Sequence, residues 1–90
     1  MPYIDKRDRW MLDIEPEQLE DAGTLNFFIT QLCTMYTIEH GLSYMTINEV
    51  IGVLECAKQE LYRRVAAPYE GFKCRLNGDV YPESLLNIGE

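Results

Sequence analysis

The residues best suited to chemistry lie close together in the C-terminal third of the chain and combine cations, phenol rings and a carboxylate. The set consists of Lys58, Tyr62, Arg63, Arg64, Tyr69, Glu70 and Lys73. A guanidinium donates two parallel hydrogen bonds to a phosphate, and a tyrosine ring stacks on a nucleobase. A carboxylate accepts hydrogen bonds from a base or ribose edge. The set therefore predicts a site for a small anionic, nucleotide-type ligand.

The same residues have a second interpretation, in which the cations stabilise the fold. On a helix, Glu60 is correctly spaced to pair with Arg63 or Arg64. One arginine would also hold a bend at Pro68 by bonding Glu70 or the free carbonyl groups of a helix end. The sequence leaves both interpretations open.

Catalytic and metal-binding patterns are missing from the sequence. The single histidine, His40, falls at a predicted helix end, and Ser43 and Ser84 lie outside any Gly-x-Ser-x-Gly context. The three cysteines are widely spaced, without the pattern of a disulfide framework or a zinc site. We therefore expect a protein that is not an enzyme, that needs no cofactor or metal, and that works in a reducing cytoplasm.

Charge is distributed unevenly along this acidic chain, whose net charge is −7. Residues 10–57 contain eight acids and no Lys or Arg, whereas residues 58–75 contain five cations and two acids. General nucleic-acid binding is disfavoured by the net charge. No apolar run is long enough for a membrane span, and no secretory signal is recognisable at the N-terminus.

Two long helices are expected to position the candidate site. Apolar residues spaced three and four apart predict a helix over 24–40, capped by Thr24 and ended by Gly41. Residues 1–23 are expected to form a short helix over 5–12, capped by Asp5, and then an acidic segment. Within this segment Pro16 is expected to start another turn, and Ala22-Gly23 to interrupt the chain.

The second long helix is predicted over residues 46–67. It would begin at a capping box in which Glu49 reaches back to the Thr46 cap, and it would end before Pro68. After Pro68 the pattern fits either a short helix ended by Gly78 or a hairpin turning at Asn77-Gly78. We favour the helix, because an isolated hairpin is marginally stable. Residues 82–90 read as an irregular tail.

These elements predict an all-α fold, a small antiparallel helical hairpin or bundle that forms a single domain over residues 1–90. Two helices of this size cannot enclose their own apolar faces, and Phe27, Met35 and Ile38 are left over on the first one. We therefore expect a homo-oligomer, most simply a symmetric dimer or a ring built from dimers.

Several short strings of the sequence resemble a family of small uncharacterised bacteriophage proteins. The most specific is YRRVAAPYE at 62–70, followed by Lys73 and by NGDVY at 77–81. Softer matches are MPYI at the start, GTLN at 23–26, IT at 29–30 and GVLECAK at 52–58. The resemblance covers most of the chain, and it implies a phage origin and a host cytoplasm.

Three functions are consistent with these features. We expect a non-catalytic phage accessory protein that binds and sequesters a nucleotide-type signal of host antiviral immunity, by analogy with small oligomeric sponges used in counter-defence. The alternatives are an acidic inhibitor that mimics nucleic acid against a host defence protein, and a structural accessory factor without a ligand site.

Overall fold

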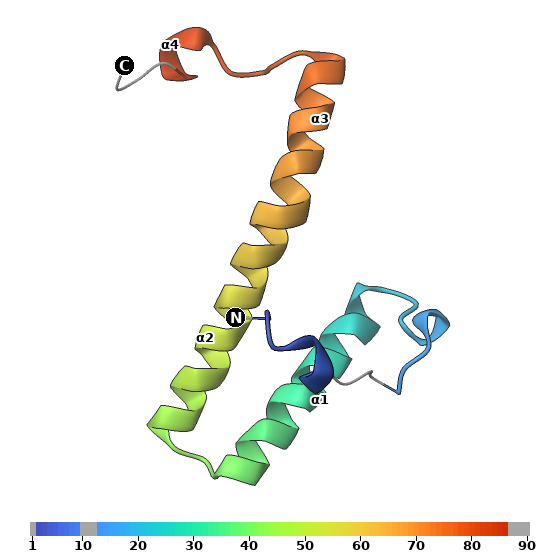
Figure 1. Cartoon of the computed structure of the whole chain (residues 1–90), viewed down its shortest axis with the longest axis vertical. Coiled ribbons are helices and arrows are strands. Elements are labelled where there is room, and N and C mark those ends of the chain that lie inside the picture. The colour runs from blue at the N-terminus through green and yellow to red at the C-terminus, as the bar shows by residue number, and fades with distance from the viewer. Residues whose placement is uncertain (1, 10–12, 87–90) are drawn as a thin grey trace. The chain divides into compact units, whose positions relative to one another are not determined.

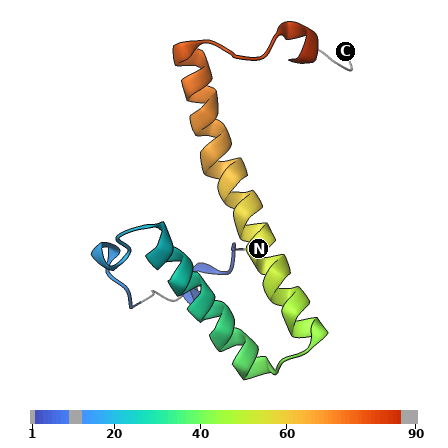
Figure 2. The same cartoon turned by 180° about the vertical axis from the view of Figure 1, so that it is seen from behind.

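The computed structural model describes residues 2–9 and 13–86, and within them every regular element is helical (Figures 1 and 2). The predicted all-α class is confirmed. In chain order the elements are the 3-10 helices η1 (Lys6–Asp8) and η2 (Pro16–Gln18), the α-helices α1 (Ala22–His40) and α2 (Tyr44–Leu61), the π-helix η3 (Tyr62–Ala66), and the α-helices α3 (Ala67–Asn77) and α4 (Glu83–Leu86).

The chain forms two compact units, Met1–Ala57 and Lys58–Glu90. We call them the N-terminal unit and the C-terminal unit and describe each by itself. The expectation of a single domain over residues 1–90 stays a prediction.

Helix α1 begins earlier than the sequence predicted. Asp21 is extended, with φ −151° and ψ 175°, and its carboxylate accepts a hydrogen bond from the Thr24 amide at 2.8 Å. The cap is therefore Asp21, and the expectation that Thr24 caps the helix is wrong. Ala22 and Gly23 form the first turn and do not interrupt the chain. The helix ends as predicted at Gly41, which has a φ of 87° that favours glycine.

Helix α2 also begins earlier than expected. The Ser43 hydroxyl accepts a hydrogen bond from the Thr46 amide at 3.1 Å, and the Ser43 carbonyl accepts from the Ile47 amide at 3.0 Å. These two bonds make Ser43 the cap, so the predicted capping box at Thr46 is wrong. Glu49 does not reach back to a cap but accepts a hydrogen bond from the Tyr36 hydroxyl of α1.

Helices α1 and α2 form the antiparallel hairpin of the N-terminal unit, and they lie side by side in both views (Figures 1 and 2). The Tyr36–Glu49 hydrogen bond joins the two helices. A narrow apolar crevice between them is lined by Leu32, Cys33, Tyr36, Val50 and Val53. This line of contact identifies the face of α1 that turns toward α2.

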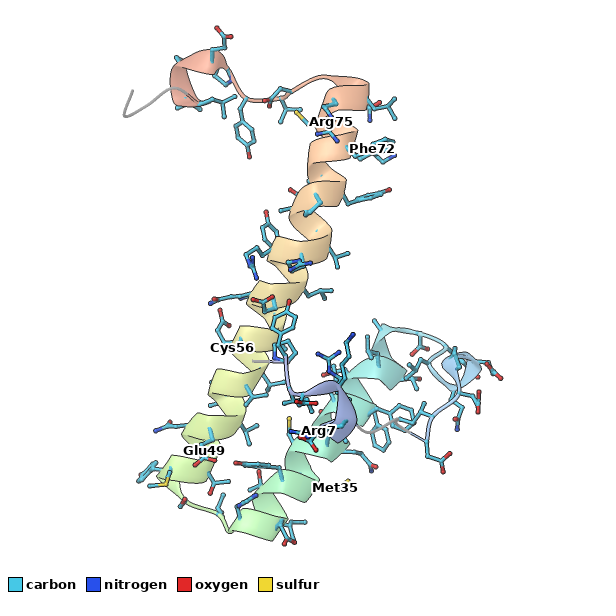
Figure 3. The ribbon with its side chains drawn as sticks, in the orientation of Figure 1. Arg7, Met35, Glu49, Cys56, Phe72 and Arg75 are labelled. Carbon is cyan, nitrogen blue, oxygen red and sulfur yellow. The ribbon has the colours of Figure 1, made fainter. Side chains whose placement is uncertain are left out.

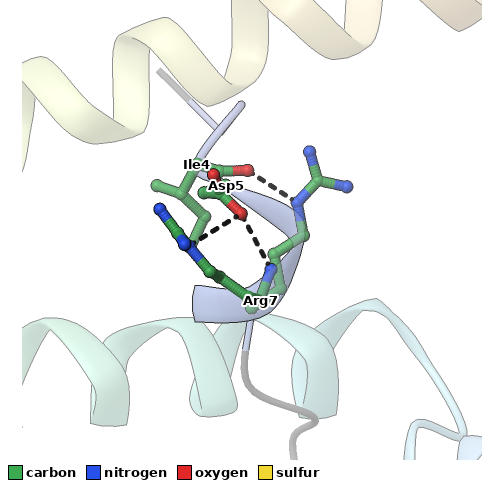
Figure 4. A network of polar contacts seen from close by, with 4 residues as sticks. Ile4, Asp5 and Arg7 are labelled. Atoms are coloured by element: carbon green, nitrogen blue, oxygen red, sulfur yellow. Dashed lines mark hydrogen bonds and ion pairs between the residues drawn. The ribbon is translucent and has the colours of Figure 1, made fainter.

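The N-terminal segment follows its predicted turns in part. Asp5 caps η1 by accepting from the Arg7 amide at 3.0 Å, and the Arg9 Nε donates to the Ile4 carbonyl at 2.9 Å (Figure 4). The expected helix over 5–12 is a 3-10 turn that ends at Asp8, and residues 10–12 lie outside the described part. Pro16 starts η2, as predicted.

The helix continues through Pro68 rather than ending before it. Ala67, the residue before the proline, is helical with φ −63° and ψ −45°, so the predicted end at residue 67 is wrong. The reason is η3, where the Ala67 amide donates to the Tyr62 carbonyl five residues earlier. Widening the turn in this way relieves the clash of the proline ring with the carbonyl four residues back. The helical residues therefore run without a break from Tyr44 to Asn77.

Beyond Pro68 the helix favoured by the sequence is confirmed and the hairpin is excluded. Helix α3 ends at Gly78, whose φ is 89° and whose amide donates to the Cys74 carbonyl at 2.8 Å. The expected irregular tail contains the single turn of α4, and residues 87–90 lie outside the described part.

Side-chain burial is very low throughout the described residues. None of their apolar side chains is buried, and Thr46, which is 5% exposed, is the one buried residue among them. No helix in this part of the chain has the length and apolarity to cross a membrane.

Candidate functional site

All seven residues of the predicted site belong to the C-terminal unit, where they are spread over three consecutive helical elements. Lys58 lies in the last turn of α2, three residues lie in η3, and three lie in α3. Of the seven, Glu70 and Lys73 both line the hollow beside α3. The structure therefore divides the predicted site into an η3 part and an α3 part.

Arg63 forms an ion pair within the helical run. Its Nη2 donates to both carboxylate oxygens of Glu60, at 2.8 and 3.0 Å, and the Glu60 side chain is only 15% exposed. This is the helical ion pair that the sequence offered as the alternative to ligand binding. Because the Arg63 side chain is 64% exposed, the pair contributes about 0–1 kcal/mol to stability.

Arg64 differs from its neighbour. It is exposed, and among the described residues it forms no ion pair or hydrogen bond. Its guanidinium therefore has its donors available for an anion. Tyr62, in the same π-helix, is 55% exposed and follows Lys58 by four residues, so these two side chains belong to neighbouring turns.

The α3 part of the site is an open groove of about 520 Å³ along the helix and the chain that follows it. Its lining consists of Ala67, Glu70, Gly71, Lys73, Cys74, Asn77, Gly78, Asp79, Val80 and Tyr81. The Tyr81 amide donates to the Asp79 carboxylate at 2.9 Å, which fixes the turn after the helix. The groove thus contains a cation, two carboxylates and a phenol ring.

Tyr69 and Lys73 act as a pair on α3. The Lys73 ammonium lies 5.8 Å from the centroid of the Tyr69 ring, within the range of a cation–π interaction. Tyr69 is 60% exposed, so a large part of its ring is accessible. The pair places an exposed aromatic ring next to a cation that lines the groove.

Sequence reasoning missed the groove residues that follow the helix. Asp79 and Tyr81 belong to the NGDVY string that carried part of the resemblance, but no role was assigned to them. The Asn77-Gly78 pair was the available signal. A glycine that ends a helix with positive φ turns the next residues back toward that helix.

The two units differ sharply in charge. The N-terminal unit has ten acids and three cations and thus the whole net charge of −7. The C-terminal unit has five of each sign and is neutral. A negatively charged ligand is therefore repelled less by the C-terminal unit than by the rest of the chain.

The structure places His40 against an aromatic ring and leaves the three cysteines unbonded to one another. The His40 ring lies 4.2 Å from the Tyr36 ring at the end of α1. Cys33, Cys56 and Cys74 are free thiols. In the described part of the chain, no three His, Cys, Asp or Glu side chains gather as ligands for a metal.

A family model described as a domain of unknown function (DUF6899) matches residues 1–80. No curated protein and no solved structure gives a significant match. The matched range includes both halves of the candidate site.

Proposed function

We propose that this chain, which belongs to the DUF6899 family, is a non-catalytic binding protein that sequesters a small phosphate-bearing, nucleotide-type ligand on its C-terminal unit. The Lys73–Tyr69 pair at the α3 groove is the observation that carries the proposal. It combines a cation for phosphate with an exposed ring for a base, and the acceptor Glu70 lies on the same groove.

Each member of the α3 part has a separate task. Lys73 attracts the phosphate as a point charge, and Tyr69 stacks on the base, a contact worth about 1–3 kcal/mol. Glu70 accepts hydrogen bonds from the base or ribose edge. Arg64 adds a planar cation on η3, where its donors have no partner within the described chain. Arg63 is left out of this set because Glu60 holds it.

The biological setting is part of the same proposal. The resemblance to phage proteins supports a phage accessory protein that acts in the host cytoplasm and removes a nucleotide signal of antiviral immunity. Removing a signal by binding requires affinity and no reaction. A site without an obvious base and nucleophile pair is compatible with that role.

Titration calorimetry with three defined probes tests the proposal: a cyclic dinucleotide, ADP-ribose and inorganic phosphate. We expect at least one nucleotide probe to bind, with Lys73→Ala and Arg64→Ala each weakening affinity at least tenfold. Arg7→Ala is the matched control, because it removes one cation from the N-terminal unit. Equal effects of all three variants would show that only net charge matters and would overturn the site. The absence of heat with every probe would overturn the choice of ligand class.

The stacking role of Tyr69 is tested separately. Tyr69→Ala is expected to weaken nucleotide binding about 5- to 150-fold, the equivalent of a stacking contact, and Tyr69→Phe to preserve it. Equal losses in both variants would assign the effect to the hydroxyl group. Far-UV circular dichroism of both variants checks that α3 remains intact.

A second candidate function rests on the charge of the N-terminal unit. A unit with a net charge of −7 presents a surface that fits a basic, nucleic-acid-binding face of a host defence protein. Affinity purification from host lysate at low and high salt tests this function. Capture of a basic protein that is released by salt, together with no nucleotide binding, would favour it. A purely structural accessory role predicts neither result.

A further inference from the structure

We propose that a second copy of the chain docks on the outer face of α1, so that two α1 helices cross antiparallel about a two-fold axis. The outer face consists of Phe27, Thr30, Gln31, Thr34, Met35 and Ile38. Five of these residues line a hollow on α1 to which α2 does not contribute, and the labelled Met35 points away from α2 (Figure 3). At the edge of the face nearer α2, Thr30, Thr34 and Ile38 share a second hollow with Leu54 of α2. The proposal concerns assembly and is independent of the ligand.

The absence of charged residues from all of α1 except its last two positions favours a protein partner over solvent. The 17 residues from Ala22 to Ile38 include no Asp, Glu, Lys, Arg or His. Phe27, Met35 and Ile38 are nevertheless 57%, 64% and 77% exposed. A helix that is apolar on several faces and uncharged is typical of an element covered on all sides.

The two threonine hydroxyl groups on the outer face already donate hydrogen bonds within α1. The Thr30 hydroxyl donates to the Asn26 carbonyl at 2.9 Å, and the Thr34 hydroxyl donates to the Thr30 carbonyl at 2.8 Å. With their hydroxyl groups bonded to the backbone of α1, Thr30 and Thr34 present their methyl groups to a partner. Because these hydroxyl donors keep their acceptors, covering them leaves no orphaned donor.

The order of side-chain sizes along the face favours another copy as the partner. The large residues Phe27 and Ile38 lie at its two ends, and the small residues Thr30 and Thr34 lie between them. In an antiparallel pair that sets Phe27 against Ile38 of the partner subunit, Thr30 faces the partner's Met35 and Thr34 faces the partner's Gln31. Each threonine thus lies opposite a longer side chain, and Thr34 lies close to the axis. A surface that fits its own inverted copy is the requirement of an isologous interface. Small residues at the centre let the two backbones approach closely.

The lack of charge on the outer face and the surface area that it would bury are both consistent with a second copy as the partner. Two copies of the N-terminal unit repel each other through their net charge of −7, but the uncharged face lets them approach without opposing carboxylates. The exposed parts of the six side chains amount to roughly 500 Å² per copy, at roughly 150 Å² for a large side chain. Two copies would bury about 1,000 Å², the lower limit of a specific interface.

Light scattering coupled to size exclusion, with paired charge variants, tests the assembly. Thr34 lies near the proposed axis, so Thr34→Glu places two like charges together, whereas mixing Thr34→Glu with Thr34→Lys pairs opposite charges. We expect twice the 10.5 kDa chain mass for the natural chain, half of that for each variant alone, and the doubled mass again for the mixture. A natural chain that stays at 10.5 kDa would overturn the proposal.

A matched control separates this face from general loss of folding. Val80→Glu adds the same charge at a residue that is 87% exposed in the C-terminal unit, and it should leave the mass unchanged. Circular dichroism should show equal helix content in all variants. If the natural chain forms a larger assembly, Thr34→Glu is expected to reduce its mass. An unchanged mass would place the contact elsewhere and overturn the proposal.

Discussion

At the scale of single residues, the caps of both long helices share one feature. The predicted cap of α1 was Thr24 and that of α2 was Thr46, and each proved to be the residue whose amide donates to the true cap. The true caps, Asp21 and Ser43, lie three residues earlier. Sequence reasoning found both helix starts but took the third residue of the first turn for the cap. Both positions have polar side chains, so composition alone did not distinguish them.

The Ser43 cap leads to a stability prediction. Ser43→Ala leaves the Thr46 amide without its acceptor and is expected to lower the free energy of unfolding by about 1 kcal/mol. Urea unfolding followed by circular dichroism measures the change. Ser84→Ala is the matched control, since this exposed serine has no such role. Equal effects of the two substitutions would show that the cap contributes nothing.

The Tyr36–Glu49 hydrogen bond gives α1 and α2 a pH-dependent connection. The bond to Glu49, and the negative charge of its carboxylate, raise the pKa of Tyr36 above its usual value of 10.0. A raised pKa in the folded state means that folding favours the neutral phenol. The stabilisation is therefore fully present below pH 10.0 and is lost as the pH rises through the folded pKa.

Thermal melts across the alkaline range test this connection. Tyr36→Phe is expected to lower the melting temperature at neutral pH, and the difference from the natural chain should shrink as the pH rises above 10.0. Tyr44→Phe serves as the control, because Tyr44 is 87% exposed. A difference that stays constant across this range would contradict a role of the phenol proton.

At the scale of elements, the sequence predicted the number and type of the main helices but not the passage through Pro68. A proline ordinarily ends the preceding helix, and the residue before it avoids helical angles. The π-helix η3 removes this conflict by moving the Ala67 amide to a carbonyl five residues away. No local sequence pattern in residues 62–66 indicates a π-turn. An α-turn and a π-turn differ in the spacing of their hydrogen bonds and not in the type of residue that forms them.

Replacing the proline tests this explanation. Pro68→Ala restores an amide donor and removes the ring, so a regular α-helix becomes possible and stability should rise by about 1–3 kcal/mol. Urea unfolding measures the gain, and Pro82→Ala, which lies outside the long helical run, should give none. A loss of stability in Pro68→Ala would show that side-chain contacts, and not the proline, hold the π-turn.

At the scale of the whole molecule, composition predicted the acidic character and the surplus of apolar surface. It did not predict that Glu70 and Lys73 would line a groove while Arg63 pairs with Glu60, because the groove depends on the turn after Gly78. The groove needs Asp79 and Tyr81, which lie beyond the end of α3 and not on the helix that carries Lys73. Spacing along a single helix therefore identified Lys73 and Glu70 but not Asp79 or Tyr81.

The lack of buried apolar residues in the described chain leads to a prediction about concentration. If copies complete one another's core, association stabilises the folded state by mass action. The melting temperature should therefore rise measurably as the chain concentration increases from 1 to about 100 µM. Differential scanning calorimetry of the natural chain measures this, with Thr34→Glu as the control that should lose the dependence. A flat profile for the natural chain would contradict self-association.

The acids that precede α1 have a further consequence for the chain as it is made. Five acids leave the ribosome just before residues 22–38, which carry no charged side chain: Asp13, Glu15, Glu17, Glu20 and Asp21. A run of like charges next to an aggregation-prone segment acts as a gatekeeper, because charge repulsion keeps incomplete chains from associating. We therefore expect the acidic segment to reduce aggregation of the nascent polypeptide during the interval in which α1 has emerged and nothing yet covers it.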